Sequence, residues 1–422
     1  MRRLNMTILA LLVICFCLNS ITSADESDVY YEFIKENYNL NEKKLNNFLL
    51  AELSMYLKLF PESHNLPASG FLMAKLNEEK GYEDIAFALL MKQLYLYPAN
   101  PIQPQIVEEA RSIITKHSQY KARLDELTLL LDTPFPACEG GDCYYNYLAF
   151  LYDLEIDKLY QWNINEYYDF IGKYGSDSRV EEVQRWIADT YLFNKDEEAA
   201  QAAYMKFERL YPESEYVPYA RTQRARILYE DLKEYPKAID LLTQVVTDYP
   251  TSDYAGSALY LRGEIRADKL REYNTAIADY RQLVNDKPRH EMVVDALFRI
   301  AEINQDKLDA SLTAIGTYNE IVESYPDDMR GAKALEETAE IYLRLDNPLS
   351  AAQQYAKVAT QFPSYMDAPE TLIKAGKVCE SKLKDYQKAI EYYQMVIDKY
   401  PDYGDIDKVE KRILKLREKT GE

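Results

Sequence analysis

Few side chains in this sequence are of the types that usually carry catalysis. The 422 residues include three histidines, His64, His117 and His290. His290 and Glu291 begin like the zinc-peptidase motif HExxH, but Val294 stands where that motif needs its second histidine. The sequence also lacks the phosphate-binding patterns GxGxxG and GxxxxGKS/T and the nucleophile pattern GxSxG. We therefore expect that the protein is not an enzyme, with no catalytic residue, no metal site and no cofactor.

Two cysteines form the one unusual local pattern. The stretch PFPACEGGDC, residues 134–143, places four residues, two of them glycine, between Cys138 and Cys143. In an exported protein, a disulfide that closes this small loop is the leading interpretation. A redox pair or a shared metal site are the alternatives, although redox pairs more often have the spacing CxxC and two thiolates do not complete a structural zinc site.

The charge balance disfavours several classes of partner. Aspartate and glutamate number 70 against 50 lysines and arginines, which gives a formal net charge of −20. Nucleic acids and anionic membrane surfaces are bound mainly through clusters of lysine and arginine, so neither fits this chain. Basic partners fit better. The alternative is that the excess of acid only keeps the molecule soluble.

The sequence contains an internal repeat of about 38 residues, which indicates how its secondary structure is organised. Prolines, most of them after an aromatic residue, recur at intervals of 38, 38, 38, 37 and 38 residues. They are Pro212, Pro250, Pro288, Pro326, Pro363 and Pro401, and the series continues towards the N-terminus with Gly175, Pro136, Pro98 and Pro61. Because proline cannot continue a helix, each of these anchors is expected to separate two helices. Residues just after an anchor are suitable helix caps, namely Ser214, Ser252, Asp327 and Ser364.

Small and aromatic residues keep a fixed distance from the anchors. Thirteen residues after an anchor stand Ala74, Ala149, Ala188, Ala225, Gly263, Ala301, Ala339 and Gly376. Twelve residues before an anchor stand Ala86, Ala200, Ala238, Ala276, Ala314, Ala351 and Ala389, and eight before stand Tyr167, Tyr204, Tyr280, Tyr318, Tyr355 and Tyr393. Small residues let two helices approach closely, and the aromatic residue one turn later fills the gap between neighbours. One helix pair cannot bury its apolar face alone, so we expect the pairs to stack.

This order of small, small, aromatic and proline residues resembles the tetratricopeptide repeat. It is present at Gly263, Ala276, Tyr280 and Pro288, and again at Ala301, Ala314, Tyr318 and Pro326. The resemblance implies an all-α fold, an α-solenoid of stacked helix–turn–helix repeats that winds as a right-handed superhelix. The family's usual period is about 34 residues. The longer form here looks like bacterial cell-envelope members, such as the periplasmic coordinator of the Tol-Pal system and the lipoprotein of the outer-membrane β-barrel assembly machinery.

The same pattern divides the chain into four expected segments. Residues 1–24 are a signal peptide, residues 25–175 are divergent helical repeats, residues 176–403 are a regular repeat array, and residues 404–422 form a capping helix. In the divergent segment, Leu124 and Asn163 replace the alanine expected twelve residues before the anchor. The last segment is rich in lysine and glutamate, as the polar cap of a repeat array should be.

The resemblance also assigns candidate binding residues, because the first helix of each pair lines a concave groove in this family. The residue after the small position and the one a helical turn further face that groove. Here acids at the first of these positions are Asp189, Glu264, Glu302 and Glu340, and acids at the second are Glu230, Asp268 and Asp306, while Tyr260 and Phe298 occupy another groove position. We predict an acidic, aromatic groove that holds an extended or helical segment bearing lysine or arginine. The alternative is a solvated charged face without a ligand.

The first residues have the pattern of a secretory signal peptide. Arg2 and Arg3 precede a short apolar stretch from Thr7 to Leu18, and Thr22-Ser23-Ala24 ends in small residues. We predict that residues 1–24 are removed on export, the alternative being an uncleaved membrane anchor. No other stretch is as long as a membrane-spanning helix, so no span is expected after removal. The expected location is periplasmic or associated with the outer membrane.

These features favour a non-enzymatic scaffold of the bacterial cell envelope. Its expected partners are other envelope proteins, bound through basic or extended segments. The apolar, tyrosine-rich helices around Val29–Leu59 are the expected contact if the chain forms a homo-oligomer. The alternative function is a secreted glycan- or peptidoglycan-associated enzyme subunit with a cleft between helical repeats.

Overall fold

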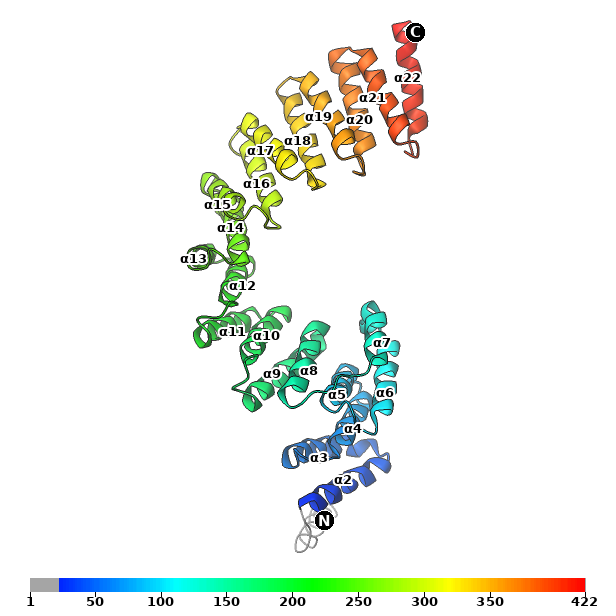
Figure 1. Ribbon diagram of the computed structural model, residues 1–422, viewed down its shortest axis with the longest axis vertical. Helices are drawn as coiled ribbons and strands as arrows, with labels where there is room; N and C mark the ends of the chain where they lie inside the picture. Colours follow the sequence, from blue (N-terminus) through cyan, green and yellow to red (C-terminus); the bar gives the residue numbers. More distant parts are fainter. Residues whose placement is uncertain (1–22, 422) are drawn as a thin grey trace. The chain divides into compact units, whose positions relative to one another are not determined.

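The structure, a computed structural model, describes residues 23–421. Every regular element among these residues is helical, and most consecutive helices within each unit pack against each other (Figure 1). The predicted all-α solenoid is confirmed. The predicted signal peptide lies outside the described residues except for Ser23 and Ala24, where the first described helix begins. No helix within residues 23–421 is both long and apolar enough to cross a membrane.

The chain divides into two compact units, Met1–Ser214 and Glu215–Glu422. The described part of unit 1 contains α2 (Ser23–Asn39), α3 (Asn46–Leu59), α4 (Leu66–Glu79), α5 (Glu83–Leu96), α6 (Gln103–Lys116), α7 (Leu124–Asp132), α8 (Gly141–Leu154), α9 (Tyr160–Lys173), α10 (Val180–Phe193) and α11 (Glu197–Leu210). Three short 3-10 helices join them, η1 (Lys43–Leu45), η2 (Ser118–Arg123) and η3 (Asp157–Leu159).

Unit 2 contains five complete helix pairs and one final helix. The pairs are α12 (Val217–Glu230) with α13 (Tyr235–Asp248), α14 (Asp253–Ile265) with α15 (Tyr273–Asp286), α16 (Val293–Asp306) with α17 (Ser311–Ser324), α18 (Arg330–Arg344) with α19 (Pro348–Gln361), and α20 (Ala368–Val378) with α21 (Tyr386–Lys399). The final helix is α22 (Ile406–Thr420). Two π-helical turns, η4 (Arg266–Leu270) and η5 (Cys379–Leu383), extend α14 and α20.

The aromatic-proline anchors lie between the end of one helix and the start of the next, as the sequence predicts. At Tyr249 the backbone leaves the helical region (φ −129°, ψ 51°) while its N–H still donates to the carbonyl of Val245 at 3.0 Å. Pro250 then prevents continuation of the helix. The hydroxyl oxygen of Ser252 accepts from the backbone N–H of Tyr254, so this serine caps α14.

The other three predicted caps are wrong. Helices α12, α18 and α20 begin three or four residues after Ser214, Asp327 and Ser364, and none of the three side chains caps a helix. An additional turn follows the anchor in these repeats, which carries the serine or aspartate too far from the first helical N–H groups. Ser214 instead donates to the carboxylate of Glu181.

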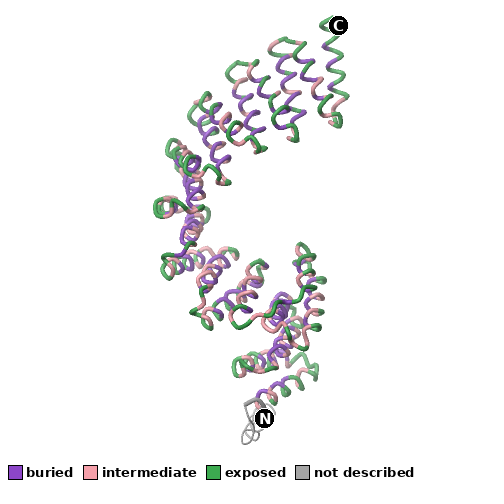
Figure 2. Tube along the Cα trace, viewed as in Figure 1, coloured by how far each residue is buried: buried purple, intermediate pink, exposed green. Residues whose placement is uncertain are grey.

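Helices of both units bury residues against their neighbours (Figure 2), some along one stripe, as in α13, and others on nearly every side, as in α5. The alanines twelve residues before the anchors are fully buried, and so are the tyrosines eight residues before them. In α17, for example, Ala314 and Tyr318 stand one turn apart on the buried face. The 38-residue pattern is therefore a packing pattern, and it accounts for the stacking of helix pairs within each unit.

Gly263 and Gly376 permit a close approach between first and second helices in unit 2. A Cβ atom added at Gly263 would lie 2.7 Å from Cε1 of Tyr280, and one added at Gly376 would lie 2.5 Å from Cε1 of Tyr393. Both distances are shorter than packed carbon atoms tolerate. The repeats that carry these glycines are also the repeats of unit 2 whose first helix continues into a π-helical turn.

Gly263→Ala is expected to destabilise unit 2, against the usual trend for glycine in a helix. Alanine normally gains about 1 kcal/mol over glycine in a helix interior, but forcing a methyl group against Tyr280 costs about 1–3 kcal/mol. Gly316→Ala in α17 is the matched control, because nothing lies within 4 Å of an added Cβ there. Urea unfolding should show a lower stability for Gly263→Ala and a higher one for Gly316→Ala. Equal gains for both would contradict the close contact.

Candidate functional site

The structure places most of the predicted groove residues on the first helices of unit 2. The acidic ones lie on α12, α14, α16 and α18 and on η4, and they are Glu230, Glu264, Asp268, Glu302, Asp306 and Glu340. All are exposed except Glu264, which is half-buried. Asp189 belongs to α10 in unit 1, so it is described with that unit.

The two predicted aromatic residues pack on tyrosines of the recurring register eight residues before the anchors. The ring of Tyr260 lies 5.5 Å from the ring of Tyr280, and the ring of Phe298 lies 5.5 Å from the ring of Tyr318. Both Tyr260 and Phe298 remain half-buried. Each of the two rings therefore contacts the core of its repeat on one side and is partly exposed on the other.

Several of the acidic side chains already have partners on neighbouring helices. The hydroxyl of Tyr229 donates to Glu264 at 3.1 Å, and the hydroxyl of Tyr355 donates to Glu340. Burial raises the pKa of Tyr229, and the nearby Glu264 carboxylate raises it further. Tyr229 therefore remains a hydrogen-bond donor at neutral pH, and Glu264 is a contact between α12 and α14.

Arg299 is the main site residue that sequence reasoning missed. Its guanidinium group binds Asp268 and also lies 3.3 Å from the carboxylate of Glu302. The only sequence signal is the three-residue spacing of Arg299 and Glu302 on one helix, which is common on solvated faces. Because Asp268 is 31 residues away, its contact with Arg299 becomes visible only when α14 and α16 are packed together.

Three of the predicted acids meet in one open pocket of about 230 Å³. Asp268, Glu302 and Asp306 line it together with Arg299 and Lys307, and its walls are completed by Ala267, Tyr273 and Ile303. Three carboxylates thus face two cationic groups. Among the described residues, Asp306 has no hydrogen-bond or ion-pair partner. We call this pocket, at η4 and the end of α16, the acidic pocket.

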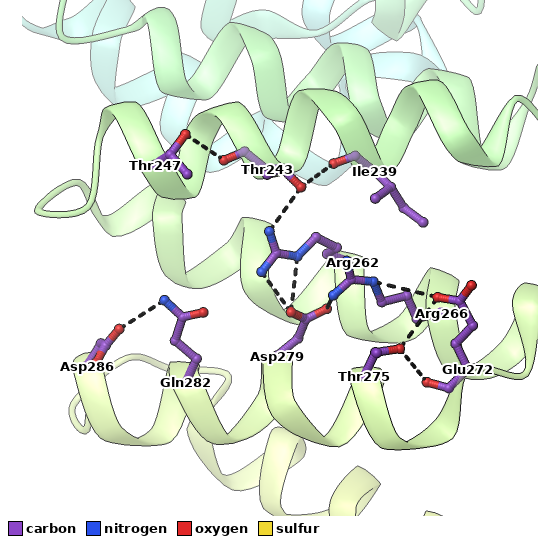
Figure 3. Close-up of polar contacts among 10 residues, drawn as sticks. All are labelled: Ile239, Thr243, Thr247, Arg262, Arg266, Glu272, Thr275, Asp279, Gln282 and Asp286. Carbon is purple, nitrogen blue, oxygen red and sulfur yellow. Dashed lines mark hydrogen bonds and ion pairs between the residues drawn. The ribbon is translucent and has the colours of Figure 1, made fainter.

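A buried ionic cluster holds the helices behind this face (Figure 3). Arg262 of α14 donates to Asp279 of α15 through Nε at 3.1 Å and Nη2 at 2.7 Å, and Arg266 donates to the other carboxylate oxygen at 2.6 Å. Arg262 also donates to the hydroxyl of Thr243 on α13 at 3.0 Å. Arg262 is 7% exposed and Asp279 is 3% exposed. One carboxylate therefore ties α14 to α15, while Arg262 reaches α13.

In unit 1, Asp189 serves as an internal acceptor. It is 9% exposed and accepts from the hydroxyls of Tyr204 at 2.6 Å and Tyr152 at 2.9 Å. Arg185 donates to the same carboxylate at 2.5 Å. Burial, more than the adjacent carboxylate, raises the pKa of Tyr152 to about 12, so this hydroxyl keeps its proton at neutral pH.

Cys138 and Cys143 are joined by a disulfide in the structure. The bond closes the loop that leads into α8, where Cys143 is buried. Phe135, in the same loop, packs its ring 5.0 Å from that of Tyr95 on α5. The disulfide therefore lies in a loop that is fastened to the core of unit 1. Within residues 23–421, no group of three or more His, Cys, Asp or Glu side chains is arranged to hold a metal ion.

Stacked helix hairpins with an exposed first-helix face define a helical-repeat protein, an α-solenoid. Models of the tetratricopeptide repeat match residues 219–252, 295–328 and 370–403, and a second model of the same repeat matches residues 186–214. Tetratricopeptide repeat models thus match four segments of the chain, each within the part where the residue pattern predicts such repeats. A comparison with the curated proteins found no match.

Several solved structures are similar to this chain at low sequence identity. A tetratricopeptide repeat protein from Parabacteroides merdae is 14% identical over 64% of this chain and 99% of its own, with a TM-score of 0.36. The C-terminal part of a repeat protein from Cytophaga hutchinsonii is 13% identical over 63% of this chain and 98% of its own, with a TM-score of 0.43. PilW, described as a type IV pilus biogenesis factor, is 18% identical over 55% of this chain and 99% of its own, with a TM-score of 0.33.

Proposed function

We propose that this protein is a non-enzymatic scaffold that binds segments of other proteins on the first-helix face of unit 2. The observation that carries the proposal is the acidic pocket, where Asp268, Glu302 and Asp306 converge beside Arg299 and Lys307. A repeat array offers an extended surface of this kind without needing a catalytic centre. The partner segment carries lysine or arginine.

The charges of the pocket suit a reversible contact with a cationic segment. Asp306 is exposed and available, while Asp268 and Glu302 share Arg299. An incoming lysine or arginine binds Asp306 first and competes with Arg299 for the other two carboxylates. Charge complementarity of this type accelerates encounter and selects partners more than it sets the final affinity. Aromatic side chains such as Tyr260 and Phe298, half-buried on α14 and α16, add contact area on the first helices.

The proposed setting is the bacterial cell envelope, either in the Tol-Pal system or in outer-membrane protein assembly. Support comes from the signal-peptide pattern of residues 1–24 and from the resemblance stated for the 38-residue repeat. Self-association is proposed to use α2 and α3, because these two helices expose Val29, Phe33, Met55 and Leu59. Crosslinking followed by mass spectrometry in the native host identifies the partner and tests both the location and the surface used.

Reversing two charges of the acidic pocket is expected to abolish most of this binding. With the crosslinked partner in hand, the double variant Glu302→Lys and Asp306→Lys should bind it at least about tenfold more weakly, a loss of about 1.4 kcal/mol, because two attractive contacts become repulsive. Isothermal titration calorimetry measures the change. Glu323→Lys on α17 is the matched control, since this exposed acid lies on a second helix. An unchanged dissociation constant for the double variant would contradict the proposal.

A further inference from the structure

The first-helix face of unit 2 changes the sign of its charge between α16 and α22. Thirteen residues after the anchor Pro401, Leu414 stands at the small-residue register, so α22 has the position of a first helix. The groove positions of α16 hold Phe298, Glu302 and Asp306, and the equivalent positions of α22 hold Lys411, Lys415 and Lys419. Lys408 lies on the same side of α22, two turns before Lys415. We call Lys408, Lys411, Lys415 and Lys419 the basic row.

The two central lysines of the basic row are available to a partner. Lys411 and Lys415 are exposed, and within residues 23–421 neither ammonium group has a hydrogen-bond or ion-pair partner. The ends of the row have local contacts: Lys408 binds Asp405 at 2.7 Å, and Nζ of Lys419 lies 4.3 Å from the ring centre of Tyr386.

Packing prevents α22 from reaching the acidic pocket of its own chain. Val409, Ile413 and Leu416 are buried in the core that α22 shares with α20 and α21. Arg412 of α22 also binds Glu380 of η5. Helices α17 to α21 lie between α16 and α22 in the stack (Figure 1). The basic row can therefore enter only the acidic pocket of another copy.

The basic row and the acidic pocket match in charge and in spacing. Lys411 and Lys415 are four residues apart on α22, and Glu302 and Asp306 are four residues apart on α16. Each pair thus spans one helical turn on one face of its helix. When the two helices lie side by side, each ammonium group can stand opposite a carboxylate. Every copy of the chain supplies both surfaces, so a second copy satisfies the charge of each.

We propose that the acidic pocket of one copy binds the basic row of a second copy. Lys411 and Lys415 contact Glu302 and Asp306, and charge complementarity selects this pairing. The inference rests on the proposed function, in which the acidic pocket binds lysine or arginine, and it names the chain itself as one source of the lysines. A partner segment then competes with α22, so self-association regulates access to the acidic pocket.

Sedimentation equilibrium of the whole protein tests the ionic contact. Self-association is expected to weaken at least tenfold between about 50 mM and about 500 mM NaCl, because salt screens the attraction between exposed charges. An apolar contact through α2 and α3 would not weaken under the same change. Self-association that is equally strong at both salt concentrations would overturn the proposal.

Charge reversal on α22 identifies the surface. Lys411→Glu combined with Lys415→Glu should weaken self-association at least about tenfold. Lys237→Glu combined with Lys357→Glu is the matched control, because these exposed lysines lie on the second helices α13 and α19 and their reversal changes the net charge equally. The control should associate like the parent protein. Equal losses in the two double variants would assign the effect to net charge and refute the contact.

A mixture of two variants tests the pairing itself. The double variant Glu302→Lys and Asp306→Lys should not self-associate, because its pocket repels the basic row. Mixed in equal amounts with the Lys411→Glu and Lys415→Glu variant, it should associate again, since each chain then offers the other a pair of opposite charge. No association in the mixture would contradict the proposed pairing.

Partner binding keeps this inference distinguishable from the proposed function. The Lys411→Glu and Lys415→Glu variant should bind the crosslinked partner at least as tightly as the parent, because α22 of another copy no longer competes. Weaker partner binding by this variant would contradict competition at the acidic pocket. The proposed function fails in a different way, through parent-like partner binding by the Glu302→Lys and Asp306→Lys variant while the mixture still associates.

Discussion

Asp279→Ala is expected to lower the free energy of unfolding by about 3–5 kcal/mol, the usual cost of breaking a buried ion pair by removing one partner. Asp279 is the acceptor for both Arg262 and Arg266 (Figure 3). Without it, Arg262 keeps only its contact to Thr243 and remains a buried charge between α13, α14 and α15. The loss arises mainly from this uncompensated charge, since a buried ion pair by itself contributes little net stability.

Two comparisons make the Asp279 prediction specific. Asp286→Ala removes an exposed carboxylate on the same helix that accepts only from Gln282 at 3.2 Å, and it should change stability by no more than about 0.5 kcal/mol. Adding Arg262→Met to Asp279→Ala removes the stranded charge, so the double variant should recover part of the loss. Urea unfolding followed by circular dichroism measures all three. A loss for Asp279→Ala no greater than that for Asp286→Ala would show that the cluster is not the tie between these helices.

The sequence was sufficient for the fold because its signals are local and repeated. At Tyr249 and Pro250 the conformational restriction of proline acts within two residues, and the resulting break is seen at the predicted position. Ala314 and Tyr318 lie one turn apart, so their shared face follows from helix geometry alone. Because the same pattern recurs about every 38 residues, several occurrences support the same prediction of helix boundaries and buried faces.

The ionic contacts could not be derived in the same way. Arg262 and Asp279 are 17 residues apart, and Arg299 and Asp268 are 31 apart, so each pair forms only after two helices are packed. With 70 acidic and 50 basic residues in the chain, very many pairings are consistent with the sequence. Asp268, Glu302 and Asp306 were predicted from their positions on first helices. Arg299, which binds both Asp268 and Glu302, was identified only in the structure.

Asn163 is a position where the sequence shows an unusual residue but does not show its structural environment. Its departure from alanine at the twelve-residue register is visible in the residue pattern. The same departure could mark a divergent, well-packed repeat or a polar pocket. The structure distinguishes the two: Nδ2 of Asn163 donates to the carbonyl of Leu151 on α8 at 3.3 Å, and Asn163 lines a pocket together with Glu155, which follows α8, and Thr190 of α10. These distances arise from tertiary packing.

Tyr318→Ala is expected to cost about 3–5 kcal/mol of stability, the range for truncating a large buried aromatic side chain. Tyr318 is 1% exposed and packs within the hydrophobic core of α15, α16 and α17. Its ring also supports Phe298 on the first-helix face. Truncation therefore leaves a cavity in the core and removes the ring on which a groove aromatic rests.

Tyr318→Leu distinguishes this packing role from a requirement for tyrosine itself. The chain uses Leu242 at the same register of α13, where it is fully buried, so leucine is compatible with the repeat and should cost clearly less than alanine. Urea unfolding gives both stabilities, and binding of the partner at the acidic pocket reports on Phe298. If Phe298 contributes as proposed, Tyr318→Leu should weaken partner binding even at a temperature where unit 2 remains folded, because leucine fills the core but offers no ring to hold Phe298 in place. Equal stability losses for alanine and leucine would instead mean that the tyrosine ring, and not the filled volume, is what the repeat requires.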